Sequence, residues 1–234
     1  MQLLLARRVN GHKLPDCVTF VAATNRRTDR AGVTGILEPV KSRFAAIVEL
    51  EAIIDDWSGW AIDSGIPVTL IAFLRYRPDL LSKFEASADL VNSPVPRTWA
   101  RVAQLEQLNL PRDIEAAAFA GAVGVAAATE YLAFRKLAGS LVTIDQILTD
   151  PVNSPIPTKV DELYAVTTGL AARANEQNFA HVGKYIARLT KDRGEFAVLA
   201  FRDAIRHTPK LAYTQTFNNL NAGPLGQLIS GGNR

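Results

Sequence analysis

Two stretches near the N-terminus are continuously apolar. Residues 17–23 read Cys-Val-Thr-Phe-Val-Ala-Ala, and residues 44–50 read Phe-Ala-Ala-Ile-Val-Glu-Leu. Short apolar runs rich in β-branched residues are typical of strands that are buried on both faces of a parallel sheet. Two strands alone cannot form a sheet whose two faces are both buried. We therefore expect the neighbouring strands to come from a partner chain or from the rest of a larger protein.

Beyond residue 51 the apolar positions recur every three or four residues, which predicts helices. Gly65 is placed to end one helix, Pro67 and Pro96 to open others, and Pro209 follows the last. The predicted helices cover residues 52–64, 67–76, 78–84, 96–108, 113–137, 158–173, 179–189 and 195–206. Before them, the pattern predicts the end of a helix over residues 2–9, a turn at Asn-Gly 10–11 and a short helix over residues 37–43.

The pattern therefore predicts a mainly α fold with a small α/β part at the N-terminus. We expect four regions: residues 1–51 with the two strands, residues 52–140 and 141–220 as helical regions, and residues 221–234 as a flexible, glycine-rich tail.

Composition changes this picture little. Hydrophobic residues make up 48% of the chain and charged residues 21%, which is ordinary for a globular protein and excludes disorder as the main state. The net charge is only +3, yet the first 43 residues carry 8 Lys+Arg against 3 Asp+Glu. Such a basic segment can face phosphate, or it can be a solvated surface.

The cysteine content, the N-terminal charges and the length of the apolar stretches bear on the cellular compartment. Cys17 is the single cysteine, so an internal disulfide framework is excluded and a reducing compartment is favoured. The N-terminus lacks the order of charges of a signal peptide. The uncharged stretch at residues 116–129 has 14 residues, where a membrane span needs about 20. We expect a cytoplasmic protein in which this stretch is a buried helix.

Three residues are candidates for contact with phosphate. Asn25 follows the first apolar run, at the edge where α/β sheets bind ligands, although Asn also forms turns. Arg43 ends the short helix before the second run, where it can reach a neighbouring subunit's phosphate or simply favour a helix C-terminus. Arg97 lies in the first turn of a helix, where a bound anion or an acidic neighbour would offset the unfavourable dipole. No P-loop motif, metal-ligand cluster or nucleophile elbow is present.

Taken together, these segments resemble an AAA+ ATPase, nearest to the MoxR-like branch. Ala-Ala-Thr-Asn-Arg at residues 22–26 resembles the end of the sensor 1 strand, and Lys-Ser-Arg-Phe at 41–44 resembles the arginine-finger segment. Residues 52–84 resemble the start of the helical lid, and Pro-Arg-Thr-Trp at 96–99 resembles sensor 2. Order and spacing match over residues 3–110, with a looser match beyond.

The resemblance implies a role for each candidate. Asn25 would position the attacking water as sensor 1, Arg43 would be the arginine finger, and Arg97 would contact nucleotide from the lid as sensor 2. Residues 1–51 would be the last two strands of a parallel P-loop NTPase sheet, residues 52–140 the lid and residues 141–220 an extension. Arg26, Arg27 and Arg30 would line a subunit interface or a substrate-facing loop.

One departure from the family is large. Its Walker A and Walker B segments, which cradle the phosphates and hold Mg²⁺, would precede Met1 and are absent from this sequence. We therefore expect a part of an ATPase that does not bind ATP and Mg²⁺ or hydrolyse ATP alone. The complete subunit would form a homo-oligomeric ring, expected to be a hexamer, that remodels a protein client.

Two other functions are considered. The chain can be a non-enzymatic helical interaction protein that docks on a complete ATPase. It can also be a nucleic-acid-binding module that uses the basic residues of the N-terminal segment. No aromatic residues are interleaved with those basic residues, so nucleic acid is disfavoured as a partner, and no membrane partner is expected.

Overall fold

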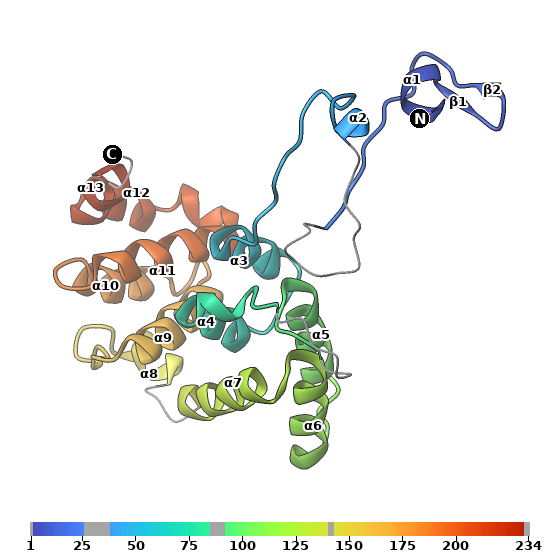
Figure 1. Ribbon diagram of the computed structural model, residues 1–234. Coiled ribbons are helices and arrows are strands. Elements are labelled where there is room, and N and C mark those ends of the chain that lie inside the picture. Colours follow the sequence, from blue (N-terminus) through green and yellow to red (C-terminus); the bar gives the residue numbers. More distant parts are fainter. Residues whose placement is uncertain (1, 26–37, 85–91, 140–142, 232–234) are drawn as a thin grey trace. The chain divides into compact units, whose positions relative to one another are not determined.

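The computed structural model describes residues 2–25, 38–84, 92–139 and 143–231 (Figure 1). The chain divides into two compact units. The first comprises Met1–Glu51 and Phe84–Leu90, and the second comprises Ala52–Lys83 and Val91–Arg234.

The first unit begins with a short helix and a hairpin. Helix α1 spans Gln2–Ala6, and strands β1 (Arg8–Val9) and β2 (His12–Lys13) pair antiparallel. Asn10 and Gly11 connect the strands with φ angles of 48° and 85°. Positive φ at both central residues is what a two-residue hairpin turn of type I′ requires, and Asn-Gly provides it at little cost. The turn was predicted, while the strands on either side of it were not.

The parallel sheet is not confirmed. Residues 18–25 and 46–53, which include most of both predicted strands, have no regular secondary structure. Their apolar side chains are largely exposed, with Val21 at 95% and Leu50 at 88% exposure. The physical reason is that a strand needs a neighbouring strand for its backbone hydrogen bonds, and the described residues offer only the β1–β2 hairpin. Between these segments, helix α2 (Glu38–Lys41) lies within the predicted short helix.

The second unit is helical, which confirms the mainly α prediction. Its helices are α3 (Ile54–Asp63), α4 (Val68–Tyr76), η2 (Pro78–Leu80), α5 (Pro96–Glu106), α6 (Arg112–Val123), α7 (Val125–Ala138), α8 (Ile144–Thr149), α9 (Val160–Ala172), α10 (Phe179–Leu189), α11 (Gly194–His207), η3 (Pro209–Tyr213), α12 (Gln215–Ala222) and α13 (Pro224–Gly231). Gly65, with a φ of 69°, follows α3, and Pro96 opens α5. These are the boundary residues that the sequence indicated.

Two expectations for this unit are corrected. Residues 113–137 form two helices instead of one, because Gly124 adopts φ 81° and ψ 154°, a conformation that interrupts a helix and suits glycine. The end of the chain was expected to be a flexible tail from residue 221. Instead, α13 (Pro224–Gly231) forms there and buries Leu225, which is 1% exposed, in a hydrophobic cluster.

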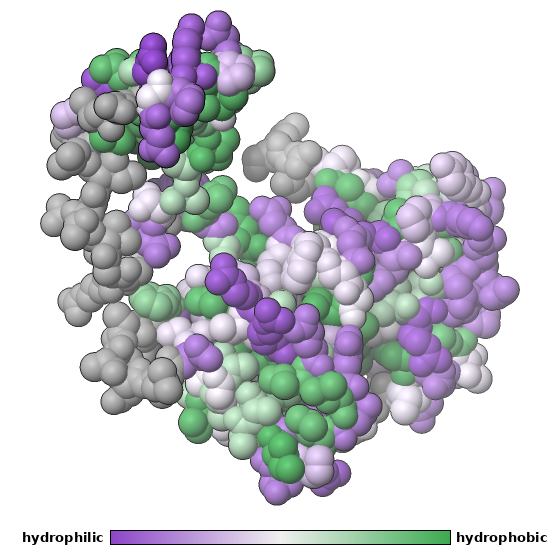
Figure 2. Space-filling view, turned by 90° about the vertical axis from the view of Figure 1, so that its right-hand side faces the viewer, coloured by the Kyte–Doolittle hydropathy of each residue, from purple (hydrophilic) through white to green (hydrophobic). Residues whose placement is uncertain are grey.

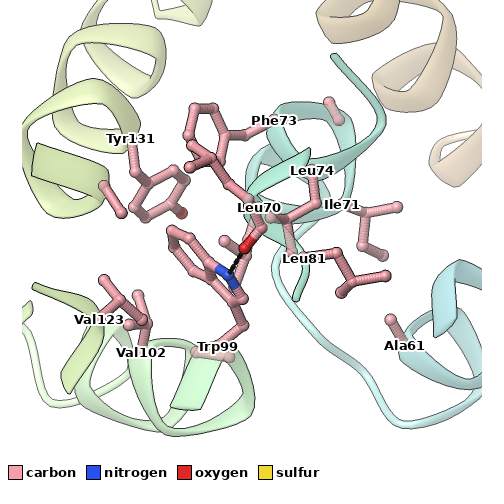
Figure 3. Close-up of a cluster of buried hydrophobic side chains, with 14 of the residues drawn as sticks. Ala61, Leu70, Ile71, Phe73, Leu74, Leu81, Trp99, Val102, Val123 and Tyr131 are labelled. Atoms are coloured by element: carbon pink, nitrogen blue, oxygen red, sulfur yellow. Dashed lines mark hydrogen bonds between the residues drawn. The ribbon is translucent and has the colours of Figure 1, made fainter. Parts of the chain in front are cut away.

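The second unit has two hydrophobic clusters. In the first, Trp99 of α5 lies among Phe73 of α4, Tyr131 of α7 and their neighbours (Figure 3). The second is formed by α8 to α11 with η3 and α13, and its largest buried side chains include Tyr185 and Phe179. Helix α9 packs against both α4 and α11, and its Tyr164 contacts both clusters. The two clusters therefore meet along α9.

The alanine-rich stretch at residues 116–129 is buried on one side only. Phe119, Val123 and Ala127 belong to the first cluster, whereas Val125 within the stretch and Ile114 just before it are 73% and 52% exposed. Hydrophobic residues gather over the lower part of the face shown in Figure 2, where α6 lies. Among the described residues, no helix has both the length and the hydrophobicity to cross a bilayer.

Candidate functional site

Arg97 lies in the first turn of α5 and is exposed. Pro96 precedes it as the first helical residue, and the backbone N–H groups of Thr98 and Trp99 both donate to the carbonyl of Val95, at 3.0 and 3.1 Å. The N–H of Arg97 is one of the first-turn donors that have no acceptor within a helix. Arg97 therefore brings both a cationic side chain and this N–H to the first turn, at the positive end of the helix dipole.

Trp99 fixes the direction in which Arg97 points. Its indole N–H donates to the carbonyl oxygen of Leu80 at 2.7 Å, and the side chain is fully buried in the first cluster (Figure 3). Two residues along a helix correspond to a rotation of about 200°, so an inward Trp99 places Arg97 on the opposite, solvent-facing side. The hydroxyl of Thr98 donates to the carbonyl of Ser93 at 3.0 Å and accepts from the N–H of Val95 at 2.9 Å. The helix start is therefore held by its own side chains.

Arg97 forms no ion pair in the part of the chain that the structure describes. The described residues show no ion pair or side-chain hydrogen bond for its guanidinium, whereas Arg101, one turn later, donates to Gln104 at 2.7 Å. The alternative interpretation, in which Arg97 bends back to a carboxylate, thus finds no support among these residues. An exposed cation with a free backbone donor is an arrangement that can bind an anion.

Arg43 follows α2 and folds back onto it. Its guanidinium donates to the carbonyl oxygen of Pro39, and the N–H groups of Arg43 and Phe44 bond to the carbonyls of Val40 and Lys41. This is the helix C-terminus role that the sequence left open as an alternative to the arginine finger. To reach a phosphate on another subunit, the side chain would exchange its bond to Pro39 for that contact.

Asn25 is exposed and lies in an irregular segment. The hydroxyl of Thr24 donates to its carbonyl oxygen at 3.3 Å. Asn25 and Arg43 belong to the first unit and Arg97 to the second. Each of the three candidates is therefore described in its own surroundings.

The other arginines of the N-terminal segment fall into two groups, those outside the described residues and those that bond to backbone carbonyls. Arg26, Arg27 and Arg30 lie outside the described residues. Arg7 donates to the carbonyls of Pro15, Asp16 and Val18, at 2.9, 3.2 and 2.7 Å.

Arg8 donates to the carbonyl of Gly11 at 2.8 Å. Both Arg7 and Arg8 therefore hold backbone carbonyls in or beside the hairpin.

Sequence reasoning missed a buried charged cluster in the second unit. Arg75 of α4 donates through both terminal nitrogens to the carboxylate of Asp203 in α11, with one distance at 3.0 Å, and through Nε to Ser58 of α3 at 3.2 Å. All three side chains are buried. The signal was present, because Arg75 and Asp203 occupy core-facing positions of apolar helices, where a charge needs a partner.

A second cluster joins α5, α6 and α7. Arg135 donates to Glu106 at 3.2 Å and to both oxygens of Glu115, and the Tyr131 hydroxyl donates to Glu106 at 2.6 Å. Burial, followed by the charge of Glu106, raises the pKa of Tyr131 well above its usual value. The phenol therefore stays neutral, and it donates a hydrogen bond to a carboxylate within the helical core.

Metal chemistry finds no ready site in the described residues. No group of three or more His, Cys, Asp or Glu side chains in them could hold a metal ion. The carboxylate of Asp150 accepts hydrogen bonds from the side-chain amide of Asn153, at 3.1 and 3.0 Å. The candidate chemistry is thus anion binding at the start of α5.

Comparisons with protein-family models, with curated proteins and with solved structures found no match to this chain.

Proposed function

We propose that this chain is the C-terminal part of an AAA+ ATPase subunit that senses nucleotide and couples ATP hydrolysis to the remodelling of a protein client. The observation that carries the proposal is Arg97, an exposed cation without a partner among the described residues, held at a helix start by the buried Trp99. In this proposal Arg97 is the sensor 2 residue, and a phosphate supplies the negative charge that the first turn of α5 favours.

Asn25 and Arg43 complete the proposed assignment. The proposal gives Asn25 the role of orienting the attacking water and Arg43 the role of stabilising transition-state charge in a neighbouring subunit of a ring. Arg43 is partly exposed at the end of α2, so a neighbour can approach it. Its present bond to a single carbonyl is of the kind that an incoming phosphate can replace, because a charged acceptor binds a guanidinium more strongly.

ATP and Mg²⁺ belong to the complete protein in this proposal. The chain offers Arg97 to phosphate, while its described residues contain no carboxylate cluster for Mg²⁺. The metal and the phosphate-cradling loop are assigned to segments that resemble Walker A and Walker B and would lie before Met1. Within the complete protein this chain is therefore expected to contact nucleotide, and by itself it is expected neither to bind nor to hydrolyse ATP.

The exposed apolar segments of the first unit support a partner sheet. Ile47, Val48 and Leu50 are 75%, 76% and 88% exposed, and residues 46–53 have no regular secondary structure. An exposed apolar segment that lies outside any sheet can pair with a strand of another segment or chain. The same observation favours the second candidate function, a non-enzymatic helical protein that docks on a complete ATPase.

The test of the proposal uses the complete protein and compares Arg97 with Arg101, which is exposed one turn further along the same helix. Arg97→Ala is expected to weaken nucleotide binding or turnover, and Arg101→Ala to leave both unchanged. Equal effects of the two substitutions would remove Arg97 from the nucleotide site. A complete protein without any nucleotide-dependent activity would favour the docking function instead.

A further inference from the structure

The junction between the two hydrophobic clusters contains a polar network centred on α11. Asp203 holds Arg75 of α4, and Arg206 holds Asp63 of α3 with distances of 3.2 and 2.6 Å. Gly59 of α3 leaves room for this contact, because a Cβ atom there would meet the Arg206 guanidinium at 2.6 Å. Asp203 and Arg206, which lie one turn apart on α11, thus tie this helix to α4 and to α3.

His207 belongs to the same face of α11. It follows Asp203 by four residues, a spacing that places two side chains next to each other on a helix. The imidazole is partly buried, and its Nε2 atom is buried without a hydrogen-bond partner among the described residues. The next residue, Thr208, donates to the carbonyl of Ala174 at 3.1 Å and so fixes the end of α11 against the end of α9.

We propose that His207 makes this junction an acid-sensitive latch: its protonation weakens the packing of α11 against α3 and α4. A protonated imidazole has two N–H donors, and the buried Nε2 would then carry a proton without an acceptor. It would also place a second cation beside Arg75 and compete for Asp203. Removing a carboxylate from a buried guanidinium is costly, so the network tolerates only the neutral ring.

The charges around His207 include some that raise its pKa and one that lowers it. Burial is the largest influence and lowers the pKa of His207, Arg75 lowers it further, and the carboxylates of Asp203 and Asp63 raise it. Arg206 is already engaged with Asp63, the phenol of Tyr164 in α9 faces Arg75, and Lys210 of η3 is exposed. The lowering of the His207 pKa by burial exceeds the raising by the two carboxylates.

The sign of the pH effect follows from linkage. The unfolded chain binds a proton at His207 with the ordinary pKa of 6.5, and the folded chain binds it only at lower pH. The stability contributed by the neutral ring is therefore complete above pH 6.5 and is lost as the pH falls through the lower, folded pKa. The contacts of α11 with α3 and α4 are therefore intact at neutral pH and weakened in acid.

The experiment compares the chain with two variants across pH 5 to 8. His207→Gln keeps a neutral polar side chain, and His12→Gln, in the exposed hairpin, is the matched control. We expect the Tm of the wild type and of His12→Gln to fall on acidification by about 2–4 °C more than that of His207→Gln. The same fall in all three proteins would overturn the proposal.

Hydrogen exchange on the wild type provides a readout that does not depend on the variant folding. After correction for the intrinsic pH dependence of exchange, protection of amides in α4 and α11 is expected to decrease between pH 7.5 and pH 5.5. Amides of α10, which contacts neither Arg75 nor Asp63, should keep theirs. An unchanged pattern, or an equal loss in all three helices, would contradict the latch.

Discussion

The guanidinium of Arg75 lies against the carboxylate of Asp203, 128 residues further along the chain, and both side chains are buried. This pair joins α4 of the first hydrophobic cluster to α11 of the second, while Ser58 of α3 accepts the remaining Nε–H of the guanidinium. A buried charge is tolerated only when its hydrogen bonds are complete. The arrangement therefore requires the two clusters to keep their present positions.

Asp203→Asn tests this requirement. The substitution keeps the shape of the side chain but leaves Arg75 buried without a counter-charge, which costs about 3–5 kcal/mol in the free energy of unfolding. Urea denaturation measures this loss. Asp63→Asn, which breaks the exposed pair with Arg206, is the control and should change stability little. Equal, small effects of both substitutions would show that Arg75 does not depend on Asp203.

Gly124→Ala and Gly121→Ala are expected to have opposite effects. Gly124 has a φ of 81°, and an added Cβ would lie 3.3 Å from the backbone oxygen of Asn92, so alanine costs about 1–2 kcal/mol there. Gly121 lies in α6 with nothing near its missing Cβ, so alanine should stabilise the protein by ~0.5–1 kcal/mol. Thermal unfolding of the two variants gives the comparison. A neutral or stabilising Gly124→Ala would contradict the break between α6 and α7.

Trp99→Phe tests the anchor that orients Arg97. The change leaves the Leu80 carbonyl without its 2.7 Å donor in a buried place, an unsatisfied group that costs ~1–3 kcal/mol. Trp60→Phe is the control, because Trp60 is 47% exposed and should tolerate the change. Calorimetry on both variants shows whether Trp99 anchors the helix through its hydrogen bond to Leu80 or only fills space in the cluster.

Arg97→Ala should leave folding intact. The side chain is exposed, with no partner among the described residues, so the expected change in unfolding free energy is within about 0.5 kcal/mol. A larger loss in urea denaturation would mean that Arg97 has a structural role and would weaken its assignment to nucleotide.

Helix boundaries were the most predictable part of the fold. Gly65, Pro67 and Pro96 act locally, through backbone conformations that glycine and proline favour, and the structure uses them as the sequence indicated. Gly124 was overlooked because the alanine-rich pattern continues through it. A Cβ atom at Gly124 would lie 3.3 Å from the backbone oxygen of Asn92, a neighbour that is distant in the sequence and that no local pattern reveals.

The strands and the charged junction could not be derived from local patterns in the same way. The apolar runs at residues 17–23 and 44–50 have the composition of buried strands, yet a strand also needs neighbours that the described chain does not supply. Arg75 and Asp203 each stand out on an apolar helix, but only the tertiary arrangement, in which α4 and α11 both pack on α9, brings them together. Asn25, Arg43 and Arg97 remain predicted site residues.

A nucleotide-binding measurement on the chain itself separates sensing from hydrolysis. We expect no change in its Tm on addition of ATP and Mg²⁺, because Arg97 alone contributes too few contacts to bind nucleotide detectably without a phosphate-cradling loop. Differential scanning fluorimetry at millimolar ATP is sufficient. A clear upward shift would place a complete phosphate site within these residues and contradict the proposed division of roles.

The DNA immediately upstream of the Met1 codon tests the central claim most directly. If the chain is the C-terminal part of an AAA+ subunit, the open reading frame continues upstream and encodes a G-x-x-x-x-G-K-[ST] segment, followed by a strand that ends in Asp-Glu. An in-frame stop codon and a ribosome-binding site directly before Met1 would contradict this account and leave the docking protein as the better proposal.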